Sequence, residues 1–338
     1  MVGLGFCGHP FFKVGNMSYV SIGDTTAMTE IMRFGMVADL QYANIDDGYN
    51  FSKTRKRYYR NAISLLQEAM NNWKKHNIEF VLQLGDIIDG FCKRNEEPVV
   101  CIDRILDLFD QETWPVYHIV GNHELYNLSK EEIYSSRLFK TLPATNKAYY
   151  SIEPHPGIKI CALNTYEIST LGSVEGTPEY NQAFEFLKKN PNEDKNNLDG
   201  LVSVNKRFGQ FNGAVSQQQI EWLKKELGSS EQQNQNVIVI GHIPIFLDAT
   251  DDVCLCWNYE DVFEAISEFE SCVVCYIGGH NHDGGLAVDD NGIHHITMHG
   301  AIEHPDTYAI GYLYEDYIRI EGIGDMFSMT IPLRFPIS

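Results

Sequence analysis

The chain has 338 residues, of which 43% are hydrophobic and 21% charged, and a formal net charge of -20 at pH 7. This length and composition are typical of a globular protein with a sizeable core. So negative a chain lacks the basic surface that binds nucleic acid or an anionic membrane, so we expect neither as a partner. No run approaches the ~20 apolar residues of a transmembrane helix.

The N-terminal segment does not resemble a secretory signal. It has no basic start, and Gly, His and Pro interrupt its apolar residues. We therefore expect residues 1–28 to be a poorly ordered extension and residues 29–338 to form a single domain, because no linker divides them. Without a secretory signal, the eight cysteines are expected to be reduced, mostly buried thiols of a cytoplasmic protein. We also expect a monomer.

The first half of the domain alternates strand-like and helical patterns. Residues 32–39, 79–89 and 115–122 are apolar, strand-like runs. Residues 54–77 carry apolar side chains near helical spacing, and residues 99–110 predict a second helix. Such alternation implies parallel strands joined by crossover helices.

The second half changes character along its length. Residues 148–166 predict a β-hairpin around two prolines. Residues 170–213, rich in Asn, Glu, Pro and Gly, predict a long excursion with a short helix at 179–189. Ser216 and Gln219 form the pattern of a capping box, ahead of a helix expected to end at Gly228.

Further strands and a helix complete the prediction. Residues 236–246 and 272–280 are strand-like, and residues 259–270 are helical. The last third alternates like antiparallel strands. We predict an α/β (α+β) fold, a β-sandwich of two mixed sheets flanked by helices.

A set of polar residues stands at the C-terminal ends of five predicted strands. Singly, each has an ordinary explanation, such as a turn asparagine or a hydrogen-bonded core histidine. Together they supply oxygen and nitrogen ligands at the edge where such sheets form their sites. They are too many for one tetrahedral zinc and suit two octahedral-type cations sharing a carboxylate. The set is Asp39, Gln41, Asp86, Asn122, His123, His242, His280 and His282.

Spacing adds to this prediction. Asp39 and Gln41 stand two residues apart, as do His280 and His282, so each pair would share one face of an extended chain. The glycines beside the histidines allow close backbone packing.

The ordered motifs D-x-Q, GD, GNHE, GH and GHNH resemble those of the calcineurin-like metallophosphoesterase superfamily. That superfamily usually has His where this chain has Gln41. The stretches "ADLQYANIDDGYNF", "TRKRYYR", "LQLGDIIDG" and "GGHNHDGG" are more specifically similar to the manganese-dependent ADP-ribose/CDP-alcohol diphosphatases. The resemblance implies a metallophosphoesterase-type sandwich and a catalytic domain over residues 29–338.

The resemblance also implies roles. Asp39, Gln41 and His282 would hold one cation, Asn122, His242 and His280 the other, and Asp86 would bridge both. His123 would act beside the scissile phosphate, with Glu124 either orienting it or lying on the surface. The cofactors would be two divalent ions, Mn²⁺ preferred over Mg²⁺, because an amide oxygen at Gln41 suits manganese and magnesium better than zinc or iron.

The implied reaction is in-line attack by a bridging hydroxide on nucleotide diphosphate conjugates. ADP-ribose would give AMP and ribose 5-phosphate, and CDP-choline would give CMP and phosphocholine. Tyr42 and Cys254 would border the nucleotide, and Arg55 could meet the second phosphate or belong to a solvated helix start. Two alternatives stay open: a cyclic-nucleotide phosphodiesterase or broad phosphoesterase on the same fold, and a non-catalytic scaffold.

Overall fold

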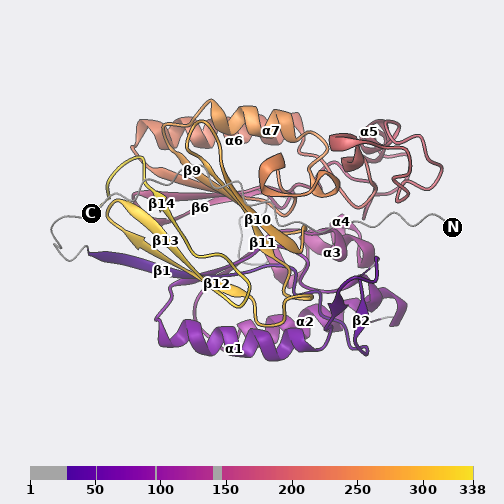
Figure 1. Cartoon of the computed structure of the whole chain (residues 1–338), viewed down its shortest axis with the longest axis horizontal. Helices are drawn as coiled ribbons and strands as arrows, with labels where there is room; N and C mark the ends of the chain where they lie inside the picture. Colours follow the sequence, from indigo (N-terminus) through magenta and orange to yellow (C-terminus); the bar gives the residue numbers. More distant parts are fainter. Residues whose placement is uncertain (1–28, 51, 96, 140–146, 338) are drawn as a thin grey trace.

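The structure is a computed structural model that describes residues 29–50, 52–95, 97–139 and 147–337. The predicted poorly ordered extension, residues 1–28, lies outside the described residues. Two six-stranded sheets face one another, and helices cover their outer faces (Figure 1). The predicted sandwich of two mixed sheets is confirmed.

The first sheet combines parallel and antiparallel pairs. β1, β4 and β5 are parallel, and β12, β13 and β14 extend the sheet from β1 in antiparallel pairs. Its strands, in spatial order, are β14 (Met329–Pro332), β13 (Tyr317–Ile323), β12 (Tyr308–Tyr314), β1 (Glu30–Val37), β4 (Phe80–Gln83) and β5 (Val116–His118).

The second sheet is also mixed. β7, β8, β9 and β11 are parallel, while β6 and β10 pair antiparallel at the two edges. The predicted hairpin is β6 with β7. In spatial order the strands are β10 (Asp283–Val288), β11 (His294–His299), β9 (Val273–Gly278), β8 (Asn236–Ile240), β7 (Ile158–Ala162) and β6 (Tyr150–His155).

The central strands are apolar because both of their faces are covered. β7, β8 and β9 are buried at every position. Figure 1 shows α1 beneath the first sheet and α6 with α7 above the second. The helices are α1 (Asn61–Lys75), α2 (Pro98–Phe109), α3 (Asn122–Asn127), α4 (Lys130–Tyr134), α5 (Pro178–Leu187), α6 (Gln217–Gln232) and α7 (Tyr259–Ser267).

The first helix starts later than the predicted residue 54. α1 begins only at Asn61, and the residues before it form β3 (Lys56–Arg57), which pairs with β2 (Gly48–Tyr49). The Tyr58 N–H donates to the Ile302 carbonyl at 3.0 Å, so the chain is held by tertiary contact and cannot continue the helix backwards.

α6 differs from its prediction at both ends. Ser216 caps it as expected, accepting from the Gln219 N–H at 3.1 Å. The Gln219 side chain, however, binds the backbone of Asn164 and does not complete the capping box. The helix also continues past Gly228 to Gln232. Gly228 therefore lies inside the helix, where a Cβ would be 3.5 Å from the ring of Phe269, a residue that follows α7.

The excursion at residues 170–213 has its own small core. Its helix α5 is confirmed, and a cluster separate from the main core packs beneath it. That cluster contains Ile168, Ala183, Leu187, Phe208, Ala214 and Trp257. Across the described residues, no helix is both long and apolar enough to cross a bilayer.

Candidate active site

The eight predicted residues converge at one edge of the sandwich. They follow the carboxyl ends of β1, β4 and β5 in the first sheet and of β8 and β9 in the second. Both sheets therefore contribute residues at this edge. Ligand-capable atoms of Asp39, Asp86 and His242 all lie within 4.8 Å of one another, and all three residues are buried. The expected clustering of these strand ends is therefore observed.

The side chains converge for a different reason from the one predicted. The expectation was an extended chain with period-two spacing. Instead, four of the residues have left-handed backbone, which costs about 1–3 kcal/mol each and is typical of functional sites. They are Asp39 (φ 53°), Gln41 (φ 42°), Asp86 (φ 54°) and His280 (φ 68°). Tight turns after the strands, not strand alternation, aim these groups at one point.

Two glycines allow the turns to approach one another. A Cβ at Gly121 would lie 2.1 Å from Asp86 Oδ1, and one at Gly279 would lie 2.6 Å from Asp39 Oδ2. Any larger residue would displace a carboxylate, so the close packing predicted for the glycine beside His280 is observed.

Asp86 occupies the middle of the cluster. Its Oδ1 accepts the His123 backbone N–H at 2.7 Å. Its Oδ2 lies 3.1 Å from Gln41 Nε2 and 3.4 Å from His242 Nε2. Burial raises the pKa of this carboxyl, but the neighbouring His242 and His123 lower it further, so the net pKa is below the usual range. One oxygen thus faces side chains from both sheets.

Asp39 lies on the other side of the cluster. Its Oδ2 accepts the His280 N–H at 3.1 Å, while Oδ1 lies 3.4 Å from His282 Nε2 and 3.9 Å from His242 Nε2. Burial lowers the pKa of His242, yet Asp86 and Asp39 raise it to about 10. The pair of buried carboxylates therefore attracts positive charge, whether proton or cation, to this point.

Three buried polar atoms test whether a cation fits. Asp39 Oδ1, Gln41 Oε1 and His242 Nε2 are inaccessible and have no hydrogen-bond partner among the described residues. Leaving such atoms unpaired is costly, and a bound cation would give them a partner. Carboxylate, amide and imidazole are donors that suit Mn²⁺. The residues fit a divalent cation.

A hydrogen-bond acceptor outside the cluster orients each of the three histidines that were predicted to be ligands. One ring nitrogen is held by an outer acceptor, which fixes the tautomer and turns the other nitrogen toward the cluster. Sequence reasoning missed all three of these acceptors. They are the Leu84 carbonyl for His242 (2.7 Å), the Asn212 amide oxygen for His280 (2.7 Å) and the Glu303 carboxylate for His282 (3.1 Å).

Asn122 is held by a residue from a sixth strand end. Its Oδ1 lies 3.0 Å from His280 Nδ1 and accepts from the Tyr166 hydroxyl at 3.0 Å. Tyr166 follows β7 and is fully buried. Tyr166 was not predicted from the sequence, although its position just beyond a strand end could have indicated that it belongs to the site.

His123 lies beside Asp86 and is paired with a second carboxylate. Its Nδ1 is 3.2 Å from Asp89 Oδ2, and its Nε2 is 3.9 Å from Asp86 Oδ2. Burial lowers the pKa of the ring, but Asp86 and Asp89 outweigh burial and raise it. The side chain is 13% exposed, so a ligand can reach it. Asp89 was not among the predicted site residues.

Glu124 supports the backbone of the site. It is 1% exposed, so the surface alternative was wrong. Its carboxylate accepts the backbone N–H groups of Asp86 (3.0 Å), Ile87 (2.6 Å) and Gly121 (2.8 Å). Burial, followed by the charge of Asp86, raises its pKa to about 7. Glu124 thus joins the turn that carries Asp86 to the turn that carries His123.

The three predicted substrate contacts lie in different environments. Arg55 belongs to a hairpin loop, not a helix start; it pairs with Asp283 Oδ1 at 2.7 Å, and its side chain is 40% exposed. Cys254 is half-buried, and burial together with nearby carboxylates, including Asp39, raises the pKa of its thiol. Tyr42 is 1% exposed, so its ring offers no surface to a ligand in this conformation.

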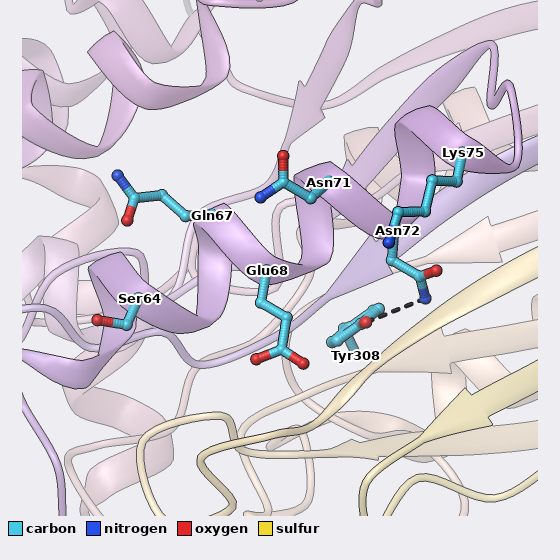
Figure 2. A pocket seen from close by; sticks show the side chains of 7 residues that line it. All are labelled: Ser64, Gln67, Glu68, Asn71, Asn72, Lys75 and Tyr308. Carbon is cyan, nitrogen blue, oxygen red and sulfur yellow. Dashed lines mark hydrogen bonds between the residues drawn. The ribbon is translucent and has the colours of Figure 1, made fainter.

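A surface hollow elsewhere contains none of these residues. It lies along α1, beside Tyr308 of β12, whose hydroxyl accepts from the Asn72 side chain at 3.0 Å (Figure 2). Its lining is polar, and it is separate from the strand-end cluster. It consists of Ser64, Gln67, Glu68, Asn71, Asn72, Lys75 and Tyr308.

Comparison with known proteins identifies the family to which this chain belongs. The sequence model of the family described as calcineurin-like phosphoesterase matches residues 32–284. The chain belongs to the calcineurin-like phosphoesterase family. The matched range contains all the metal-site residues predicted from the motifs. Because such a match covers most of the chain, the predicted superfamily is confirmed.

Curated relatives narrow the comparison within the calcineurin-like phosphoesterases. The human protein named manganese-dependent ADP-ribose/CDP-alcohol diphosphatase is 38% identical over 87% of this chain and 90% of its own length. The Arabidopsis thaliana protein of the same name is 38% identical over 89% and 97%. A crystal structure of a dimetal phosphatase from Danio rerio is 35% identical, with a TM-score of 0.87, and covers 90% of this chain and 100% of that chain.

Proposed function

We propose that this chain is a manganese-dependent hydrolase of the diphosphate bond in nucleotide diphosphate conjugates such as ADP-ribose and CDP-alcohols. One observation carries the proposal: Asp39, Asp86 and His242, from three strand ends, form a buried cluster in which Asp39 Oδ1 and His242 Nε2 lack hydrogen-bond partners among the described residues. The relatives named for this activity, and the dimetal phosphatase that shares the fold, support it.

We propose two cation positions that share Asp86. Asp39, Gln41 and His282 would hold one cation, and Asn122, His242 and His280 the other. The approach of Asp86 Oδ2 to Gln41 from one set and His242 from the other supports a bridging role. When bound, such cations polarise phosphoryl oxygens and generate a nucleophile from water at neutral pH.

The chain's own contribution to bond cleavage is assigned to His123. Its Nε2 lies 3.9 Å from Asp86 Oδ2 and its Nδ1 lies 3.2 Å from Asp89 Oδ2, so the ring can present an N–H near the cluster. There it would give a proton to the departing oxygen of the leaving phosphate, or stabilise charge that develops on the phosphoryl group. Arg55 and Cys254 would contact the substrate beyond the cations, while a contact by Tyr42 would require its ring to become exposed.

A substrate panel tests the proposed function. ADP-ribose, CDP-choline, cyclic AMP and p-nitrophenyl phosphate are assayed with Mn²⁺, and products are separated by chromatography. We expect AMP with ribose 5-phosphate from the first and CMP with phosphocholine from the second, at higher kcat/KM than for the other two. Preference for cyclic AMP or the monoester would favour the alternative phosphoesterase. Absence of turnover with every substrate would favour the alternative of a non-catalytic scaffold.

The amide side chain of Gln41 leads to a prediction about which metal ion activates the enzyme. A neutral amide oxygen binds zinc and iron less well than imidazole does, so wild type should be strongly activated by Mn²⁺ and weakly by Mg²⁺. Gln41→His should tighten metal binding and shift preference toward zinc or iron. Activity is measured against metal concentration for both proteins, with metal analysis after dialysis. Wild type that retains two zinc or iron ions through dialysis and ignores Mn²⁺ would contradict the prediction.

We propose a cytoplasmic location and a monomeric state for this enzyme. Seven cysteines are free thiols in the structure, and all except Cys254 are buried, which supports a reducing compartment. The eighth, Cys7, lies outside the described residues. Large exposed apolar side chains such as Tyr49, Val174 and Val288 are scattered over separate elements, which supports a monomer. Sedimentation of the purified chain measures that state.

A further inference from the structure

The outer partners of the three metal-site histidines differ in charge. His242 is held by a backbone carbonyl and His280 by the Asn212 amide, both neutral. His282 is held by Glu303, a carboxylate. A carboxylate behind an imidazole raises its basicity as a ligand more than a neutral acceptor does. The charged partner therefore stands behind the histidine that is grouped with Gln41.

We propose that Glu303 is a positioning residue that sets the cation affinity of the Asp39–Gln41–His282 position. This inference rests on the two cation positions of the proposed function. That position contains one carboxylate of its own and a neutral amide, which is a weaker donor than imidazole. Negative charge placed behind His282 would compensate for the weak donor at Gln41.

The segment that carries Glu303 is fixed to both sheets. The Gly300 N–H donates to the His282 carbonyl at 3.2 Å. The next two N–H groups, of Ala301 and Ile302, donate to the carbonyls of Ala38 (3.1 Å) and Asp39 (2.9 Å). Glu303 follows directly, so its backbone is anchored to the two turns that carry ligands of this position.

The Glu303 carboxylate has a second partner of opposite charge. Its Oε1 accepts from Arg57 Nε at 2.9 Å as well as facing His282 Nδ1, and it is only 4% exposed. Arg57 Nε therefore binds the same carboxylate oxygen that holds His282.

The hydrogen-bond direction follows from these contacts. With Nδ1–H donated to Glu303, the lone pair of His282 lies on Nε2. Nε2 lies 3.4 Å from Asp39 Oδ1 and 2.9 Å from the amide nitrogen of Gln41, so it faces the other two residues of the same position. Glu303 thus fixes both the tautomer and the ring orientation that this position requires.

Glu303→Gln tests the inference, because the amide keeps the shape and an accepting oxygen but loses the charge. Mn²⁺ binding to the full chain is followed by the electron paramagnetic resonance signal of free Mn²⁺. We expect two Mn²⁺ in wild type. In the variant, one site should weaken by about 10–100-fold while the other keeps its affinity. The Mn²⁺ concentration for half-maximal activity should rise by the same factor, with kcat at saturating Mn²⁺ within a few-fold.

A matched control separates this effect from general instability. Asp289→Asn removes the carboxylate of another buried pair, with His295 Nε2 at 3.2 Å, and should leave Mn²⁺ binding unchanged. If Glu303→Gln does not fold, because Arg57 is left unpaired, the double variant Arg57→Met with Glu303→Gln removes both charges and decides the question.

The outcomes distinguish the two proposals. Wild type that binds no Mn²⁺ would overturn the proposed function. Two Mn²⁺ sites in wild type, with either unchanged affinity or equal weakening of both sites in the Glu303 variants, would overturn this inference alone.

Discussion

Asp86→Ala is expected to reduce hydrolysis of ADP-ribose by at least ~10³-fold while the protein stays folded. The variant removes the carboxylate that faces both proposed cation positions, and such metal-ion catalysis exceeds the ~10²–10³-fold contribution of a single hydrogen-bond donor. Alanine at the left-handed φ of 54° costs about 1–2 kcal/mol, a small part of a typical folding free energy. Glu124 still accepts the backbone N–H at this position.

The measurements are kcat with Mn²⁺, metal content after gel filtration, and the shift of Tm on adding Mn²⁺. Wild type should gain stability from Mn²⁺, because a ligand that binds only the folded state raises Tm, and the variant should gain little. Asp86→Asn is the matched variant, since asparagine tolerates left-handed backbone and keeps the shape. Near-normal turnover in both variants would contradict the bridging role.

His123→Ala should lower kcat by ~10²–10⁴-fold, the range of an acid–base or electrostatic contribution. Its metal content should stay near that of wild type. The physical reason is that the backbone N–H of residue 123, which binds Asp86 Oδ1 at 2.7 Å, remains in the alanine variant. The ring itself touches Asp89 and approaches Asp86 Oδ2 only to 3.9 Å.

Two comparisons make this prediction decisive. A substrate whose leaving group has a low pKa needs little protonation, so a general acid predicts a smaller loss for it, whereas electrostatic stabilisation predicts an equal loss. Asp89→Asn should show a weaker version of the same kcat effect. Loss of metal in step with loss of activity would mean that His123 is a ligand and that its assigned role is wrong.

The clustering of the strand-end residues was predictable because their signal is local. Asp39, Asp86 and His242 each follow an apolar run directly, and parallel strands bring such ends to one edge of a sheet. The motif order then specified the superfamily, which the comparisons confirm. The parallel strands were expected from the same runs, since strand–helix alternation implies parallel strands joined by crossover helices.

The supporting residues were not predictable because their contacts are between distant segments. Glu303 meets His282 and Arg57 only when a loop after β11 is placed between the two sheets. Asn212 reaches His280 from the end of an excursion that the sequence shows only as polar. The left-handed turns were missed because Asp39 and Gln41 fit a strand period equally well, and local pattern does not distinguish the two.

The most direct test of the central claim is anomalous diffraction from crystals of this chain soaked with Mn²⁺. We predict two anomalous peaks on either side of Asp86, one against Asp39, Gln41 and His282, the other against Asn122, His242 and His280. A single peak, or peaks remote from Asp86, would contradict the two-cation site from which the proposed function is argued.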